Sequence, residues 1–153
     1  MPLPNIFDKK VTDGVIDRIN KLTPQTQPQW GKMNVGQMLA HLCVTYEMLF
    51  DPNRFPKPKG LMKLLLKFVI KSTVCGETPY KRNLRTAPAF LMTEEKDFYA
   101  EKARLIDYLN QVQALGAQHF DGKESHSFGT LNINEWNNMF YKHLDHHLTQ
   151  FGV

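Results

Sequence analysis

The chain has 153 residues, the length of one domain, and its composition (42% hydrophobic, 22% charged) is that of a folded globular protein rather than a disordered one. The 19 basic and 15 acidic residues are interspersed along most of the sequence, and a net charge of +4 is too small an excess to indicate a nucleic-acid-binding protein. Two cysteines outside any CxxC pair exclude a disulfide-stabilised secreted domain, so we expect both to be reduced in a cytoplasmic protein.

No basic start followed by an apolar run marks an export signal, and the most apolar stretch, Leu61 to Ile70, is about half as long as a membrane-spanning helix. These features argue against a membrane protein. We expect a single domain covering residues 1–153, with one functional site.

Two helices are predicted in the N-terminal third of the chain. Apolar residues at helical spacing favour a helix over residues 6–22, which Thr23-Pro24 ends. A second helix is expected over residues 34–50, because Asn34 and Gln37 have the types and the spacing of a capping box. No segment of the chain keeps the alternating pattern of a half-buried strand.

Three more helices are expected after a basic, proline-containing link. Residues 61–72 predict a short apolar helix, and residues 73–92 show no clear period; so long an irregular segment in a small domain usually covers a site. A long helix is expected over 93–115, with acidic residues in its first turn. The last begins at Asn132, which repeats the capping pattern with Glu135, and runs nearly to the C-terminus. The sequence therefore predicts an all-α fold.

Three of the six histidines gather in the last predicted helix. His143 and His147 are four residues apart, about 40° around the helix and about 6 Å along it, so they point to the same side. Trp136 and Phe140 share that face, which indicates that it turns toward the core. His41 stands on the apolar side of the second helix. Because buried imidazoles need partners for their ring nitrogens, one divalent ion shared by the three histidines is a consistent hypothesis.

Simpler explanations of these histidines stay open. A histidine pair near a helix C-terminus also complements the helix dipole, and a buried histidine often donates to a backbone carbonyl. His146 is a competing ligand because it is three residues from His143, but it lies to one side of the inward face. We expect it to support the ligands or to lie at the surface.

Polar residues near the predicted ligands could orient them or a substrate: Gln37, Thr45 and Gln150. Cys43 points about 200° away from His41 around the same helix, so we expect it in the core and not as a fourth ligand.

Two basic patterns have weaker functional interpretations. A row of lysines follows the helix 61–72, namely Lys63, Lys67 and Lys71. Such a row could lie on an anionic membrane, but a helix this short more often covers a core or makes a homodimer contact. A basic cluster in the irregular segment, Lys81, Arg82 and Arg85, could hold a phosphate or a nucleic-acid backbone, and a solvated loop is the simpler interpretation.

The segments that carry the histidines resemble the DinB-like superfamily. The resemblance spans about residues 28–152 and rests on three stretches: Trp30-Gly31-Lys32-Met33 to His41-Leu42, Ser127-Phe128-Gly129, and Glu135-Trp136 to His143-Leu144-Asp145-His146-His147-Leu148-Thr149-Gln150-Phe151-Gly152. It is closest to an uncharacterised bacterial branch with these W-G-K-M and H-L-D-H-H-L-x-Q-F-G signatures. The resemblance implies a four-helix bundle with a long crossover, here with an additional short helix 61–72. It also implies a Zn²⁺ or Ni²⁺ site whose ligands in this sequence are His41, His143 and His147, the residues that the spacing selects.

Some members of this superfamily join low-molecular-weight thiols to electrophiles, so a metal-dependent thiol S-transferase with a small-molecule substrate is one expected function, but the resemblance itself implies a site and not a substrate. A hydrolase would usually need a general base beside the ion, whereas Glu47 and Asp145 point away from the ligand faces. We therefore expect one divalent transition metal, Zn²⁺ before Ni²⁺, and a thiol partner. The alternatives are a non-catalytic metal-binding or metal-sensing protein, a metal-dependent hydrolase, and a basic adaptor for nucleic acid.

Overall fold

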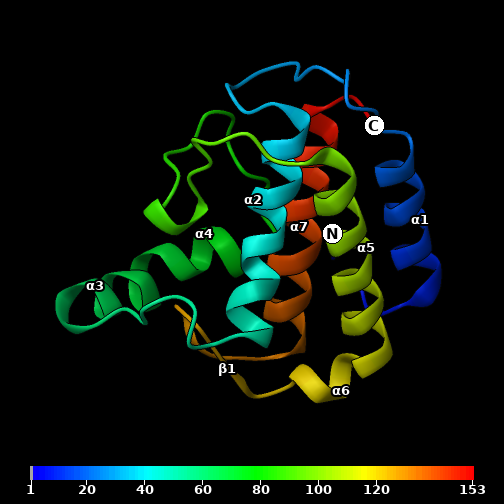
Figure 1. Cartoon of the computed structure of the whole chain (residues 1–153). Coiled ribbons are helices and arrows are strands. Elements are labelled where there is room, and N and C mark those ends of the chain that lie inside the picture. Colours follow the sequence, from blue (N-terminus) through cyan, green and yellow to red (C-terminus); the bar gives the residue numbers. More distant parts are fainter. Residues whose placement is uncertain (1) are drawn as a thin grey trace.

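Four long helices lie side by side in the computed structural model, which describes residues 2–153 (Figure 1). They are α1 (Lys9–Asn20), α2 (Val35–Phe50), α5 (Phe98–Leu115) and α7 (Ile133–Gln150). Each of α1 and α2 contacts both α5 and α7, and the closest packing is between α2 and α5. The protein is thus mostly helical, as the sequence predicts.

The two predicted capping boxes are both present. The side chain of Asn34 accepts from the backbone N–H of Gln37, and the Gln37 side chain accepts from the backbone N–H of Asn34. Asn132 and Glu135 make the same reciprocal pair at the start of α7. Because these bonds join residues three apart, the two helices that carry the histidines begin where local sequence places them.

Two other helices begin later than predicted. The first starts at Lys9 and not near residue 6, because Asp8 caps it and Asn137 of α7 accepts from the backbone N–H of Ile6. The helix predicted from residue 93 begins at Phe98, with Asp97 as its cap. A tertiary contact outweighs the local helical preference at the first of these starts, and the local cap of Asp97 sets the second.

The predicted short helix is part of a longer projection, here called the arm, which covers residues 60–75. It consists of α3 (Gly60–Leu65), the π-helical turn η1 (Leu66–Ile70) and α4 (Lys71–Cys75). The arm extends away from the long helices in Figure 1, and α4 is the part of it that packs on α7. After it, residues 76–97 are irregular except for the 3₁₀ turn η2 (Pro88–Phe90).

A small antiparallel hairpin, which the sequence did not predict, accompanies the helices of this otherwise all-α fold. It joins β1 (Lys123–Ser125) to β2 (Gly129–Leu131), just after the short helix α6 (Ala117–Phe120). The Ser125 hydroxyl accepts from the backbone N–H of Phe128 and donates to the carbonyl of Gly129. Gly129 has a φ of 71°, which favours glycine. Strands of three residues are too short to show an alternating pattern, so the sequence prediction missed them.

The core lies between the four long helices and includes residues near both ends of the chain, namely Ile6, Phe7 and Phe151. Tyr46 of α2 stacks on Phe140 of α7, and Phe120 packs against the same ring. Arg18 of α1 donates to the carbonyl of Val153. Within the described part of the chain, no helix combines the length and the apolar character needed to cross a membrane.

Candidate metal centre

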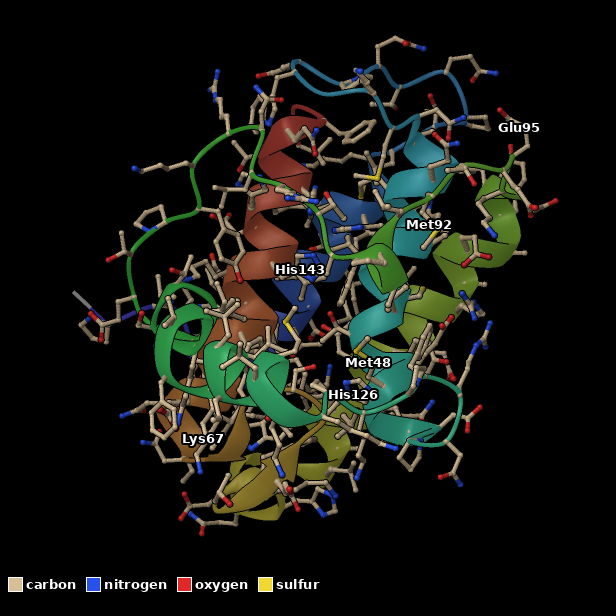
Figure 2. All side chains as sticks on the ribbon, turned by 90° about the vertical axis from the view of Figure 1, so that its left-hand side faces the viewer. Met48, Lys67, Met92, Glu95, His126 and His143 are labelled. Atoms are coloured by element: carbon tan, nitrogen blue, oxygen red, sulfur yellow. The ribbon has the colours of Figure 1, made fainter. Side chains whose placement is uncertain are left out.

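Three histidines from two helices meet at one end of a cavity: His41 of α2 with His143 and His147 of α7. One ring nitrogen from each lies within 4.8 Å of the others, and the Nε2 atoms of His41 and His143 are 2.9 Å apart. His41 and His147 are buried and His143 is partly buried. Figure 2, seen from the side of the arm, shows His143 between α7 and α2. This group could hold one metal ion with bonds of about 2 Å after small side-chain rotations.

The Nδ1 atom of each ring is occupied by a neighbouring oxygen. His41 donates from Nδ1 to the carbonyl of Phe90 at 2.9 Å, and His147 donates from Nδ1 to the side-chain oxygen of Gln150 at 2.7 Å. Nδ1 of His143 lies 3.2 Å from the hydroxyl oxygen of Thr45. Partners of this kind orient histidine ligands in metal sites and leave Nε2 free for the ion. The donor set therefore fits a divalent transition metal.

The tautomers of the rings follow from these bonds. A carbonyl can only accept, so the neutral His41 carries its proton on Nδ1 and offers a lone pair at Nε2. In the metal-free chain, His143 must then donate from Nε2 to His41 and accept at Nδ1 from Thr45. Binding an ion at Nε2 of His143 requires its proton at Nδ1, where the Thr45 oxygen can accept it. The Thr45 hydroxyl suits both states because it can donate and accept.

The site keeps its imidazoles neutral. Burial lowers the pKa of His41, although its bond to the carbonyl of Phe90 works in the opposite direction. Burial, and then the neighbouring imidazoles of His41 and His147, hold the pKa of His143 well below its ordinary value. The pKa of His147 is lowered to about 3, mainly by burial. Neutral rings are the form that binds metal, so these shifts favour a ligand role near neutral pH.

The Gln150 amide connects His147 to Trp30 and Gly31, the first two residues of the W-G-K-M stretch. It donates to the carbonyl of Trp30 at 2.7 Å while its oxygen accepts from His147. Gly31 has a φ of 84°, and a Cβ there would lie 2.5 Å from the Gln150 nitrogen. Only glycine leaves room for this bond, which gives a physical reason for the glycine after Trp30.

The carboxylates that were expected to point away are engaged elsewhere. Glu47 is buried and pairs with Arg104 at 2.6 Å, and Asp145 pairs with Arg18 at 2.7 Å. Cys43 is also remote: its thiol contacts the carbonyl of Glu101 on α5, and burial raises its pKa to about 12. It lies in the core, as expected.

The remaining candidates have different surroundings. Both ends of the Gln37 amide serve backbone groups, because the oxygen completes the capping box and the nitrogen donates to the carbonyl of Glu94. The ring of His146 lies outside the cluster, at edge-on angles to Trp30 and Tyr80. The guanidinium of Arg82 lies 4.0 Å from the centre of the Trp30 ring. Thr45 and Gln150 thus contact ligand rings directly, whereas Gln37 does not.

A cavity of about 1530 Å³ leads from the surface to the three histidines. The arm, the hairpin, α2, α7 and the irregular segment after the arm all contribute to its lining. The segment 73–92, expected to cover a site, lines this cavity and supplies the carbonyl of Phe90. The arm contributes mostly apolar side chains to the lining, namely Met62, Leu66, Ile70 and Val74, whereas α2 contributes the polar Gln37, His41 and Thr45 beside Met48 and Leu49. A largely apolar wall with a few polar groups is typical of small-molecule sites.

Two functional contributions were missed by sequence reasoning. The carbonyl of Phe90 is a backbone group that any residue could supply, so no sequence signal marks it. Lys142 looks like a surface residue next to His143, yet it is buried and donates to the carbonyls of Thr73, Gly76 and Thr78. It thereby attaches the end of the arm to the helix that carries two of the histidines.

A family model matches residues 7–152, nearly the whole chain, and the protein belongs to that family. The family is DUF1569, described as a protein of unknown function. No curated protein and no solved structure gave a significant match. The family and the three-histidine cluster together define a mostly helical protein with a candidate metal site.

Proposed function

We propose that this protein binds one divalent transition metal through the Nε2 atoms of His41, His143 and His147. The observation that carries the proposal is the set of oxygens that occupy the three Nδ1 atoms, because it leaves three neutral nitrogens directed at one another. Nitrogen ligands favour Zn²⁺ or Ni²⁺ over Mg²⁺ or Ca²⁺, and Zn²⁺ is our first choice. His146 remains outside the proposed ligand set.

The proposal includes a relationship to the DinB-like superfamily. In support, α1, α2, α5 and α7 lie side by side, and a long connection that contains the arm joins α2 to α5. One ligand comes from the second long helix and two come from the last. Cytoplasmic placement belongs to the same proposal, since the buried cysteines Cys43 and Cys75 are both free thiols.

The reaction that we propose for this site is transfer of a small thiol to an electrophile. A divalent ion with three neutral ligands and an open position supplies the Lewis acidity that keeps a thiol ionised at neutral pH. The sulfur would form a bond to carbon while an epoxide C–O bond opens, and the freed oxygen would take a proton from water. The ion pairs of Glu47 and Asp145 favour this chemistry over hydrolysis, because neither carboxylate is available as a base.

Metal content is the first test. Untagged protein incubated with Zn²⁺ and then desalted should retain close to one equivalent, and His41→Ala, His143→Ala and His147→Ala should each lose most of it. His146→Ala is the matched control because it removes a histidine from the same helix turn. Absence of bound metal in the unaltered chain, or an equal loss in the control, would refute the proposed ligand set.

A Co²⁺-substituted sample tests the thiol reaction. Bacillithiol, glutathione and cysteine are titrated separately while the visible spectrum and the loss of a model epoxide are followed. A sulfur-to-cobalt charge-transfer band with turnover that disappears in His41→Ala supports the transferase. Metal binding without any spectral change or thiol consumption leaves a non-catalytic metal-binding protein as the function.

A further inference from the structure

The cavity is larger than a small thiol requires. Its volume of about 1530 Å³ exceeds the roughly 300–1000 Å³ of most small-molecule pockets. The inner side of the arm contributes Met62, Leu66 and Ile70 to its wall, at a spacing of four residues. Met48 of α2 and Met139 of α7 also line it. A long apolar ligand would therefore contact the arm on one side and the long helices on another.

The arm has a second apolar side that does not line the cavity. Leu61 is 83% exposed and Phe68 is 72% exposed, and neither belongs to the cavity wall. The neighbouring Met62 and Leu66 are on the cavity side. Substitutions on the two sides of the arm can therefore distinguish a ligand bound inside the cavity from one that adheres to the outer surface.

Most of the charged side chains that line the cavity are basic. Lys57, Lys81 and Arg85 line it and are exposed, while Glu124 is the acidic residue in its lining. No ion-pair partner for these three cations is found among residues 2–153. An excess of positive charge along a cavity wall attracts anions and repels cations.

We propose that the cavity binds an elongated apolar molecule that carries an acidic group. Its apolar part lies between the arm and α2, its acidic group lies beside exposed cations of the cavity wall such as Lys81 and Arg85, and one end reaches the three histidines. This inference rests on the proposed function in one respect: it names the substrate class of the proposed metal site. Binding of the molecule in the cavity requires no metal.

A matched pair of dyes tests the proposal in the presence of EDTA. The apolar anion 1-anilinonaphthalene-8-sulfonate and its uncharged counterpart N-phenyl-1-naphthylamine share one ring system and become fluorescent in apolar surroundings. We expect the anion to bind at least about fivefold more tightly at low salt, and the two affinities to converge within about twofold near 0.5 M NaCl. Equal affinities of the two dyes at low salt, or no saturable binding of either dye, would overturn the proposal.

Variants locate the dye. Leu66→Asp and Met62→Asp should each weaken both dyes by about tenfold, whereas Leu61→Asp should change neither by more than about twofold, with circular dichroism confirming the fold. An equal loss in Leu61→Asp would assign the dye to the outer surface and overturn the proposal.

The double variant Lys81→Gln/Arg85→Gln should weaken only the anion, by about fivefold. The control Lys10→Gln/Lys21→Gln removes the same charge from exposed positions in and beside α1. An equal effect of the two double variants would exclude a local acidic subsite. Dye binding that persists in His41→Ala, which should not bind metal, distinguishes this inference from the metal-binding proposal.

Discussion

Thr45 is the residue whose chemistry depends most directly on whether an ion is bound. Its hydroxyl faces Nδ1 of His143, which accepts a hydrogen bond in the metal-free state and must donate one when Nε2 binds metal. A hydroxyl serves in both states, and a methyl group of the same size serves in neither.

We therefore expect Thr45→Val to weaken Zn²⁺ affinity by about 10- to 100-fold, the usual cost of losing a group that orients a ligand. Thr45→Ser keeps the hydroxyl and should stay within about threefold of the unaltered protein. Competition with a chromogenic chelator measures the Zn²⁺ affinities of both variants. A Thr45→Val protein that binds Zn²⁺ as tightly as Thr45→Ser would show that the hydroxyl has no such role.

The depressed pKa of His147 makes the stability of the metal-free protein depend on pH. The imidazole titrates near 6.5 when unfolded and near pH 3 in the folded chain, so below pH 6.5 only the unfolded state binds the proton. The free energy of unfolding should fall as pH decreases from 6.5 toward 3, by at most roughly 1.4 kcal/mol per pH unit for this group. Above pH 6.5 the group contributes no dependence.

Urea unfolding in EDTA at several pH values tests this dependence. His147→Gln lacks the titrating group, so its stability relative to the unaltered chain should improve by roughly 1–2 kcal/mol between pH 7 and pH 5. If the free energies of unfolding of the two proteins changed in parallel with pH, the lowered pKa of His147 would be contradicted.

At the scale of elements, the attachment of the arm depends on α7. Asn138 donates to the carbonyl of Cys75, and Lys142 donates to three carbonyls at the end of α4. The Lys142 ammonium also lies 4.6 Å from the centre of the Tyr80 ring. The same helix therefore carries two candidate ligands and holds the base of the arm that forms one wall of the cavity.

Replacing Lys142 with Met should detach the end of the arm from α7. The change keeps the apolar stem but leaves the three carbonyls without the ammonium, so we expect the free energy of unfolding to fall by about 1–3 kcal/mol. Hydrogen exchange should increase in residues 71–80 and stay unchanged in α1. Lys10→Met, at an exposed position of α1, is the control. Uniform exchange throughout the molecule would mean that Lys142 stabilises the whole fold and not the arm.

At the scale of the whole molecule, the candidate site joins segments that are far apart in the chain. His41 and His143 are separated by 102 residues and lie on different helices. An ion bound to both would bind only the folded state tightly, so it should stabilise that state as a whole.

Zn²⁺ at a free concentration of 100 times its dissociation constant should add about 2.7 kcal/mol to the free energy of unfolding. Thermal or urea unfolding with Zn²⁺ and with EDTA measures the difference. It should vanish in His41→Ala and persist in His146→Ala. A Zn²⁺ effect of unchanged size in His41→Ala would place the ion at another site.

Features that depend on residues three or four apart can be predicted from the amino-acid sequence alone. The capping boxes at Asn34 and Asn132, the facing pair His143 and His147, and the inward side of His41 are all properties of single helices. A helix has one geometry, so spacing along the chain is enough to predict them.

The surroundings of those helices depend on tertiary contacts. The carbonyl of Glu94, in the non-helical segment before Phe98, accepts from the Gln37 side chain, and the proton position on His41 depends on a carbonyl 49 residues away. The arm lies beside the cavity because Lys142 reaches carbonyls that no local pattern marks. These contacts join residues that are remote in sequence through backbone groups common to every amino acid. They therefore cannot be predicted from residue types and their spacing along the chain.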